Sequence, residues 1–193
     1  MKKVILILII FCCCKAYSQP YPTGLNVNDK APDFTAIDQN GTKINLNKAL
    51  KKGSVVLVFY RGQWCPYCNK QLKQLEDSIS FIKAKGATVF AITPELPENI
   101  SKTIEKTKAS YSILFDDGLK IMNEYKVAFQ VEDKTVEKYK GYGIDFLKVN
   151  GNNGASLPVP AVYVVNKKGN IIYRFFDINY TKRSTIKDIL DRL

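Results

Sequence analysis

The sequence contains no histidine, and this absence removes several kinds of catalytic site. A Ser–His or Cys–His pair cannot form, and a metal site would lack its commonest nitrogen ligand. Cysteine is also scarce: the chain has five, and three of these stand together at positions 12–14. The other two cannot complete a four-ligand zinc site unless carboxylates join them. We therefore expect no metal cofactor.

Arginine is scarce as well, although the chain is strongly basic. The formal net charge is +11, yet arginine occurs only at positions 61, 174, 183 and 192. The remaining basic residues are lysines, scattered as singles and pairs. A nucleic-acid surface more often shows clustered arginines with interleaved aromatic side chains. The composition therefore indicates a lysine-rich surface and no nucleic-acid partner.

Residues 1–18 show the pattern of an export signal. A basic start precedes an apolar run at 4–14, and small residues follow shortly before Gln19. The run is shorter than the roughly 20 residues that span a bilayer. We expect cleavage after residue 18, an exported and periplasmic protein, and no membrane span in the mature chain. Lipid attachment at one of the cysteines at 12–14 is the alternative. Residues 19–193 would form one domain.

The mature chain would then contain only Cys65 and Cys68, in the sequence Trp64-Cys65-Pro66-Tyr67-Cys68. A buried strand is predicted directly before this motif and an amphipathic helix directly after it. Cysteines at this spacing share one face of the first helical turn, close enough for a disulfide. Pro66 suits that turn, and the free N–H groups at the helix N-terminus favour a Cys65 thiolate. The layout is that of a thioredoxin-like redox site. A structural disulfide is the less favoured interpretation, because so short a loop contributes little entropy.

The hydrophobic pattern elsewhere predicts an α/β fold with a central mixed sheet flanked by helices. A β-hairpin is expected over 31–46. Residues 130–157 interrupt the alternation of strands and helices, and we interpret them as a surface insertion. The remaining expected strands lie at 54–59, 87–92, 112–115, 162–165 and 171–176, and the helices at 48–52, 65–85, 99–109, 119–125 and 181–193.

From residue 31 onward the chain resembles the alkyl hydroperoxide reductase and thiol-specific antioxidant (AhpC/TSA) family, the peroxiredoxin-like branch of the thioredoxin superfamily. The resemblance implies a thioredoxin-like fold, with the insertion placed before the strand that follows a cis-proline at Pro160. It also implies that Cys65 is an exposed nucleophile and Cys68 the resolving cysteine. The segments that carry the resemblance, besides the Trp-Cys-Pro-Tyr-Cys motif, are Ala-Pro-Asp-Phe at 31–34, Phe-Tyr-Arg-Gly at 59–62, Ile-Thr-Pro-Glu at 92–95 and Val-Pro-Ala at 159–161. The stretch 177–183, from Asp177 to Arg183, also resembles the family, but the resemblance assigns it no role.

Two positions depart from the family pattern. A peroxidatic motif resembles Pro-x-x-x-Thr-x-x-Cys, in which the threonine hydroxyl binds and polarises the peroxide. The corresponding positions here hold Val58 and Gly62. The departure shifts the expectation from peroxides toward disulfides.

Several further residues are expected to support the site. Arg61 is either a cation beside the thiols or a surface residue at the strand end, and Trp64 is either a lid over the thiols or part of the core. Thr93 is expected to border the site. Pro66 and Tyr67 form the dipeptide that glutaredoxins use between their cysteines. A cis-Pro160 would leave the backbone of Val159 free to pair with an extended substrate.

We therefore expect a thiol–disulfide oxidoreductase outside the cytoplasm, with no cofactor beyond the Cys65–Cys68 pair. Its partners would be protein thiols or disulfides, or a thioredoxin-like electron donor. One alternative is a thiol-dependent peroxidase, an antioxidant enzyme that reduces hydroperoxides through a Cys65 sulfenic acid. The second alternative is a binding module with an inert disulfide.

Overall fold

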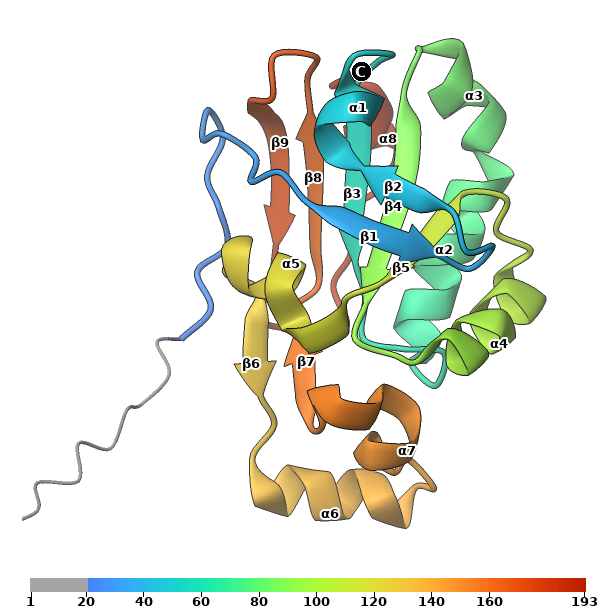
Figure 1. Ribbon diagram of the computed structural model, residues 1–193, viewed down its shortest axis with the longest axis vertical. Helices are drawn as coiled ribbons and strands as arrows, with labels where there is room; N and C mark the ends of the chain where they lie inside the picture. The colour runs from blue at the N-terminus through green and yellow to red at the C-terminus, as the bar shows by residue number, and fades with distance from the viewer. Residues whose placement is uncertain (1–20) are drawn as a thin grey trace, which may run out of the picture.

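The computed structural model describes residues 21–193, so the predicted signal sequence lies outside the described residues. Seven strands form the central sheet (Figure 1). The middle strand, β3 (Val55–Phe59), is parallel to β4 and antiparallel to β8, as expected for a mixed sheet. The order across the sheet is β2 (Lys43–Asn45), β1 (Thr35–Asp38), β5 (Ser112–Phe115), β4 (Thr88–Thr93), β3, β8 (Ala161–Val165) and β9 (Ile171–Phe176). The predicted hairpin is confirmed as the antiparallel pair β1–β2.

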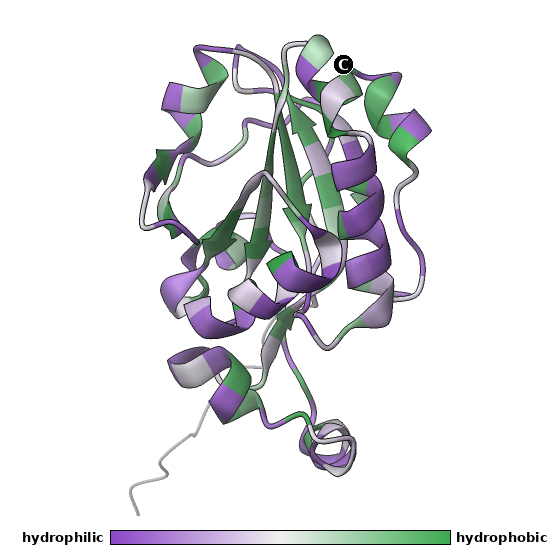
Figure 2. Cartoon of the chain, turned by 90° about the vertical axis from the view of Figure 1, so that its right-hand side faces the viewer, coloured by the Kyte–Doolittle hydropathy of each residue, from purple (hydrophilic) through white to green (hydrophobic). Residues whose placement is uncertain are grey.

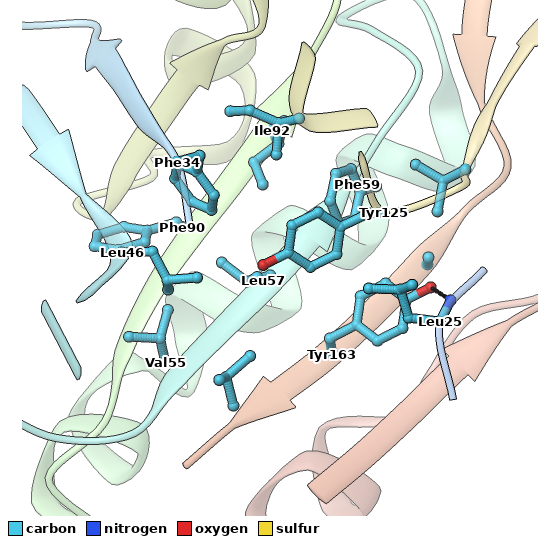
Figure 3. Packing of buried hydrophobic residues seen from close by; sticks show 14 of the residues in the cluster. Leu25, Phe34, Leu46, Val55, Leu57, Phe59, Phe90, Ile92, Tyr125 and Tyr163 are labelled. Atoms are coloured by element: carbon cyan, nitrogen blue, oxygen red, sulfur yellow. Dashed lines mark hydrogen bonds between the residues drawn. The ribbon is translucent and has the colours of Figure 1, made fainter. Parts of the chain in front are cut away.

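Alternating side chains of β3 point into two separate cores, because successive residues of a strand face opposite sides of a sheet. Leu57 and Phe59 belong to one core and Val58 to the other. In the first core the Phe59 ring packs 5.2 Å from the Tyr125 ring and 6.0 Å from the Tyr163 ring (Figure 3). Figure 2 shows the result as a hydrophobic sheet enclosed by helices whose outer faces are polar.

Helices cover both faces of the sheet. Those that bury residues in the core of Phe59 are α1 (Leu46–Leu50) and α5 (Lys120–Glu124), the latter preceded by the 3₁₀ turn η1 (Asp117–Leu119). Those that pack against the opposite face are α2 (Pro66–Asp77), α3 (Ile79–Ala84), α4 (Pro97–Thr107) and α8 (Ile186–Leu190). The sheet and its two helical layers confirm the predicted fold class.

The single helix expected over 65–85 is wrong in one respect, because it is broken at Ser78. Ser78 has φ −109° and ψ 6°, so α2 ends before it and α3 begins after it. Serine favours such breaks because its side chain competes for backbone hydrogen bonds. The apolar stripe survives the break: Leu72, Leu75 and Ile82 are all buried in the same core.

The segment expected to be an insertion forms a small layer beyond the end of the main sheet (Figure 1). Strands β6 (Ala128–Gln130) and β7 (Ser156–Pro158) pair to bring its two ends together. Between them lie α6 (Asp133–Gly141), α7 (Phe146–Asn150) and the 3₁₀ turn η2 (Gly151–Asn153). The layer has its own hydrophobic cluster around Phe146, and Trp64 packs against that cluster. The insertion therefore adjoins the cysteine motif.

The expected cis-proline is wrong, since residues 21–193 contain no cis peptide bond and the Val159–Pro160 bond is trans. The physical reason lies in the hydrogen bonding of this segment. β7 pairs with β6, and directly after it the Val159 N–H donates to the Val127 carbonyl at 2.8 Å. Only Val159 and Pro160 separate β7 from β8. No helix within the described range is long and apolar enough to cross a membrane.

Candidate active site: a buried disulfide under an arginine

The cysteine motif begins where β3 leaves the sheet. A turn follows in which the Cys65 N–H donates to the Gly62 carbonyl at 3.1 Å. Cys65 caps the N-terminus of α2, and its sulfur accepts a hydrogen bond from the Cys68 N–H at 3.3 Å. Pro66 opens the helix, where a missing N–H costs nothing. The predicted placement of Cys65 at a helix N-terminus is confirmed.

Cys65 and Cys68 form a disulfide with a Cα–Cα distance of 5.2 Å. Both are buried, with 1% of Cys65 and 0% of Cys68 exposed. The expectation of an exposed Cys65 is therefore wrong in this oxidised form. The physical reason is that the loop between β9 and α8 brings Arg183 against both sulfurs.

Arg183 contacts both sulfurs of the disulfide. Its Nη2 lies 3.3 Å from the Cys68 sulfur and 3.8 Å from the Cys65 sulfur. Its Nη1 donates to the carbonyls of Tyr180 and Lys182, which fixes the guanidinium in place. Burial, and secondarily the charge of Arg61, lower the pKa of Arg183 to about 10. The side chain thus stays cationic at neutral pH and can stabilise a thiolate formed on reduction.

Sequence reasoning did not assign Arg183 to the site. A contact between residues 115 positions apart leaves no local pattern in one sequence. The usable signal was composition: in a chain whose basic residues are nearly all lysine, each of the four arginines stands out. Arginine, with its planar fork of donors, is favoured where one cation must serve several partners.

Arg61 lies beside the site but does not serve as its sulfur ligand. Only 4% of it is exposed, so the surface interpretation is wrong. Its guanidinium carbon lies 4.9 Å from the Trp64 ring centre and 4.4 Å from that of Tyr180. It also donates a hydrogen bond to the hydroxyl of Tyr139, which belongs to α6. Arg61 therefore joins the insertion to the loop that carries Arg183.

Of the two alternatives for Trp64, a lid over the thiols or part of the core, the structure supports the core. The Trp64 ring packs against the core that contains the two cysteines and against the insertion. Its ring centre lies 5.2 Å from that of Tyr139 and 6.0 Å from that of Phe146, and both of these residues belong to the insertion. Tyr67 is 42% exposed and packs edge-on against Tyr180, with the ring centres 6.0 Å apart. This aromatic pair braces the loop against α2.

Gly62 leaves no room for a side chain. A Cβ atom at this position would stand 2.6 Å from Glu95 Oε1 and 2.6 Å from Trp64 Nε1. Glu95 is fully buried and accepts a hydrogen bond from the Gln63 N–H at 2.7 Å. Burial raises the pKa of Glu95 to about 8, against the lowering effect of that hydrogen bond, so it holds a proton at pH 7. The threonine of a peroxidatic motif would clash with Glu95 and Trp64.

Thr93, Val159 and Pro160 form hydrogen bonds with segments other than the cysteine motif. The buried Thr93 hydroxyl accepts a hydrogen bond from the Glu95 N–H at 3.3 Å, so Thr93 positions Glu95. The Val159 N–H is already bonded to Val127 and is not free for a substrate strand. The Pro160 carbonyl accepts from the Asp177 N–H at 3.4 Å, where the loop that carries Arg183 begins. Among residues 21–193, no group of three or more Asp, Glu, Cys or His side chains could hold a metal ion.

Comparisons with known proteins give the chain its family. Residues 27–174 match the model of the AhpC/TSA family. The chain is 33% identical over 103 residues to chloroplastic peroxiredoxin Q from Populus jackii, covering 53% of this chain and 48% of that protein. It is 32% identical over 104 residues to peroxiredoxin Bcp from Escherichia coli, covering 53% and 65%. The match thus spans about half to two thirds of the length of these relatives.

Among solved structures, peroxidoxin BcpB from Mycobacterium tuberculosis superposes with a TM-score of 0.66 at 18% identity, covering 86% of this chain and 94% of that one. This similarity concerns the fold. Because the family model covers most of the sequence, the chain belongs to the AhpC/TSA family.

Proposed function

We propose that the protein is a thiol–disulfide oxidoreductase whose working group is the Cys65–Cys68 pair. Membership of the AhpC/TSA family supports thiol redox chemistry in general. The disulfide at the start of α2 supports a dithiol mechanism in particular. The choice of disulfides over peroxide as the substrate rests on the surroundings of Gly62. The space that a peroxide-polarising hydroxyl would need is occupied by Glu95 and Trp64.

In the reducing direction the thiolate of Cys65 attacks one sulfur of a substrate disulfide. A bond forms between Cys65 and that sulfur, the substrate S–S bond breaks, and the second substrate sulfur leaves as a thiolate that takes up a proton. Cys68, as a thiolate, then attacks the Cys65 sulfur and releases the first substrate sulfur. The substrate gains two electrons and the protein disulfide re-forms; the oxidising direction is the reverse.

The surroundings of the pair suit this sequence of steps. The helix N-terminus and the Cys68 N–H favour negative charge on Cys65. The guanidinium of Arg183, 3.3 Å from Cys68, favours negative charge when Cys68 is the attacking or leaving sulfur. Because both sulfurs are buried, exchange requires the loop with Tyr180 and Arg183 to move aside.

The test is reduction of insulin disulfides by dithiothreitol in the presence of the wild type, Cys65→Ser and Cys68→Ser. The wild type should accelerate the reaction. Cys65→Ser should abolish the acceleration because no nucleophile remains, and Cys68→Ser should accumulate a mixed disulfide on Cys65 that mass spectrometry detects. Equal rates for the wild type and Cys65→Ser would instead support an inert binding module.

A thiol-dependent peroxidase is the second candidate, and the observation that favours it is the similarity to peroxiredoxin Q and peroxiredoxin Bcp. In that reaction peroxide oxidises the Cys65 thiolate to a sulfenic acid, and Cys68 condenses with it to give the disulfide and water. The two candidates share both cysteines, so their rates with peroxide and with disulfides separate them.

We also propose that the protein acts outside the cytoplasm. The basic start and apolar run of residues 1–18 support this location. Mass spectrometry of the protein recovered from cells that produce the full chain should find an N-terminus at Gln19. An N-terminus at Met1 would contradict the proposal.

A further inference from the structure

Four lysines line an open cavity of about 420 Å³ at the end of the sheet opposite the cysteine motif. They come from the segments that precede β3 and β4 and from the segment that follows β8. The strand register brings these segments together, because Val55 of β3 pairs with Thr88 of β4 and with Val165 of β8. The cysteine motif follows the other end of β3. The lysines, which we call the basic patch, are Lys52, Lys85, Lys167 and Lys168.

The positive charge of the basic patch is not balanced. All four lysines are exposed, and among residues 21–193 none of them forms an ion pair. A fifth lysine lies beside them, since the Lys30 Nζ donates to the Lys168 carbonyl at 2.8 Å. The other described residues of the lining are uncharged: Ser54, Gly86 and Asn166. Like charges this close repel one another, so the patch favours an anionic partner.

The chemistry of the patch favours an extended anionic surface over a single bound anion. Its cations are lysines, whereas arginine is the side chain suited to bidentate recognition of one carboxylate or phosphate. Within the described lining, no buried side-chain donor lacks a hydrogen-bond partner, as is expected of a site built for one small anion. Exposed, flexible point charges instead suit the headgroup region of an anionic membrane.

An exposed aromatic side chain accompanies the lysines. Phe81 of α3 is 65% exposed. The Lys85 N–H donates to the Phe81 carbonyl at 3.2 Å, and residues four apart in a helical turn share one face. Helices that bind at a membrane interface combine lysines with an apolar side chain of this kind. Phe81 therefore favours a lipid surface, which its ring can enter, over a hydrated acidic polypeptide.

We propose that the basic patch and Phe81 dock the protein onto a membrane surface that contains anionic lipids. The Phe81 ring enters the interface, and the lysines lie at the level of the lipid phosphates. Because the patch and the cysteine motif lie at opposite ends of β3, docking turns the disulfide end of the molecule toward partners in solution. The inference concerns location and does not depend on which substrate the cysteines react with.

The first experiment measures binding to lipid vesicles by co-sedimentation. The vesicles consist of phosphatidylcholine alone or of equal parts of phosphatidylcholine and phosphatidylglycerol. The protein is purified from cells that produce the full chain. The ratio of the two partition coefficients isolates electrostatic binding from any contribution of the apolar run at 4–14. This ratio should lie well above one and should fall as added salt screens the lysines; a ratio of one overturns the proposal.

Two double variants separate the patch from the net charge of the protein. Each lysine near an anionic surface contributes a factor of about five, so Lys85→Gln/Lys168→Gln should lower the ratio about 30-fold. Lys134→Gln/Lys138→Gln removes two exposed lysines from α6, at the opposite end of the molecule (Figure 1), and should keep the wild-type ratio. An unchanged ratio in the first variant, or an equal loss in both, overturns the proposal.

The apolar contact and the competing partner have their own tests. Phe81→Ser should weaken binding to the mixed vesicles about tenfold while the salt dependence stays the same; an unchanged affinity overturns the role assigned to Phe81. Poly-glutamate, offered in place of vesicles, represents an acidic polypeptide. Tight binding of poly-glutamate together with no binding to the mixed vesicles would assign the basic patch to an acidic protein and overturn the membrane proposal.

Discussion

Replacing Arg183 by methionine should lower the reduction potential of the Cys65–Cys68 pair. The guanidinium lies 3.3 Å and 3.8 Å from the two sulfurs. A cation at these distances stabilises a thiolate more than a neutral disulfide sulfur, so it favours the reduced form whenever a thiolate is present. Methionine keeps most of the length and apolar contact of the side chain but removes the charge.

The magnitude follows from the strength of such an interaction. A hydrogen bond to a charged group contributes about 1.5–3 kcal/mol. For a two-electron couple about 1.4 kcal/mol corresponds to about 30 mV, so the variant should be more reducing by roughly 30–60 mV. Equilibration of each protein with a glutathione redox buffer at pH 7, followed by alkylation and mass spectrometry, measures the potential.

The pH dependence distinguishes an electrostatic role from a packing role. The difference between the wild type and Arg183→Met should shrink at acidic pH, where both cysteines are protonated and no thiolate remains for the cation to stabilise. Arg192→Met is the matched control, because it removes the same charge from an exposed position near the C-terminus. Equal potentials for wild type and Arg183→Met, or a difference that persists unchanged into acid, would refute the reasoning.

Three further predictions concern the surroundings of the disulfide. Because burial raises the pKa of Glu95 to about 8, the folded protein keeps a proton that the unfolded chain has lost, and stability should fall as the pH rises from about 5 to 8. Urea unfolding should show a loss of up to roughly 4 kcal/mol over this window that Glu95→Gln lacks; identical pH profiles would contradict the assignment. Gly62→Ala should destabilise the fold by roughly 1–3 kcal/mol through overpacking, measured in the same assay, because its Cβ would stand 2.6 Å from Glu95 and Trp64. Tyr180→Ala, which removes the contacts with Arg61 and Tyr67, should open the loop and speed reduction of the disulfide by 2-mercaptoethanol about tenfold; an unchanged rate would show that the loop does not limit access.

Local sequence patterns were sufficient to predict most of the secondary structure. The apolar run of β3 and the hairpin turn before it depend on neighbouring residues, and the structure confirms both. The placement of Cys65 at a helix N-terminus was predictable for the same reason. The break at Ser78 was not, because the apolar stripe continues on both sides of it.

Contacts between segments that are distant in the chain could not be predicted from the sequence. Arg183 reaches the cysteines from a loop more than a hundred residues later, and Tyr139 reaches Arg61 from the insertion. The burial of Cys65 and the trans Val159–Pro160 bond also depend on how remote segments pack and pair. Hydrophobic periodicity reports which face of an element is buried, but not which residues meet there.

The choice between disulfides and peroxide is tested most directly by the reduced wild-type protein in a stopped-flow instrument. Its thiols are mixed in separate runs with hydrogen peroxide and with a peptide disulfide, and Trp64 fluorescence follows formation of the Cys65–Cys68 bond. The geometry at Gly62 predicts reaction with peroxide no faster than that of a free thiolate, and much faster reaction with the disulfide. Oxidation by peroxide orders of magnitude faster than a free thiolate would contradict the proposal and establish a peroxidase.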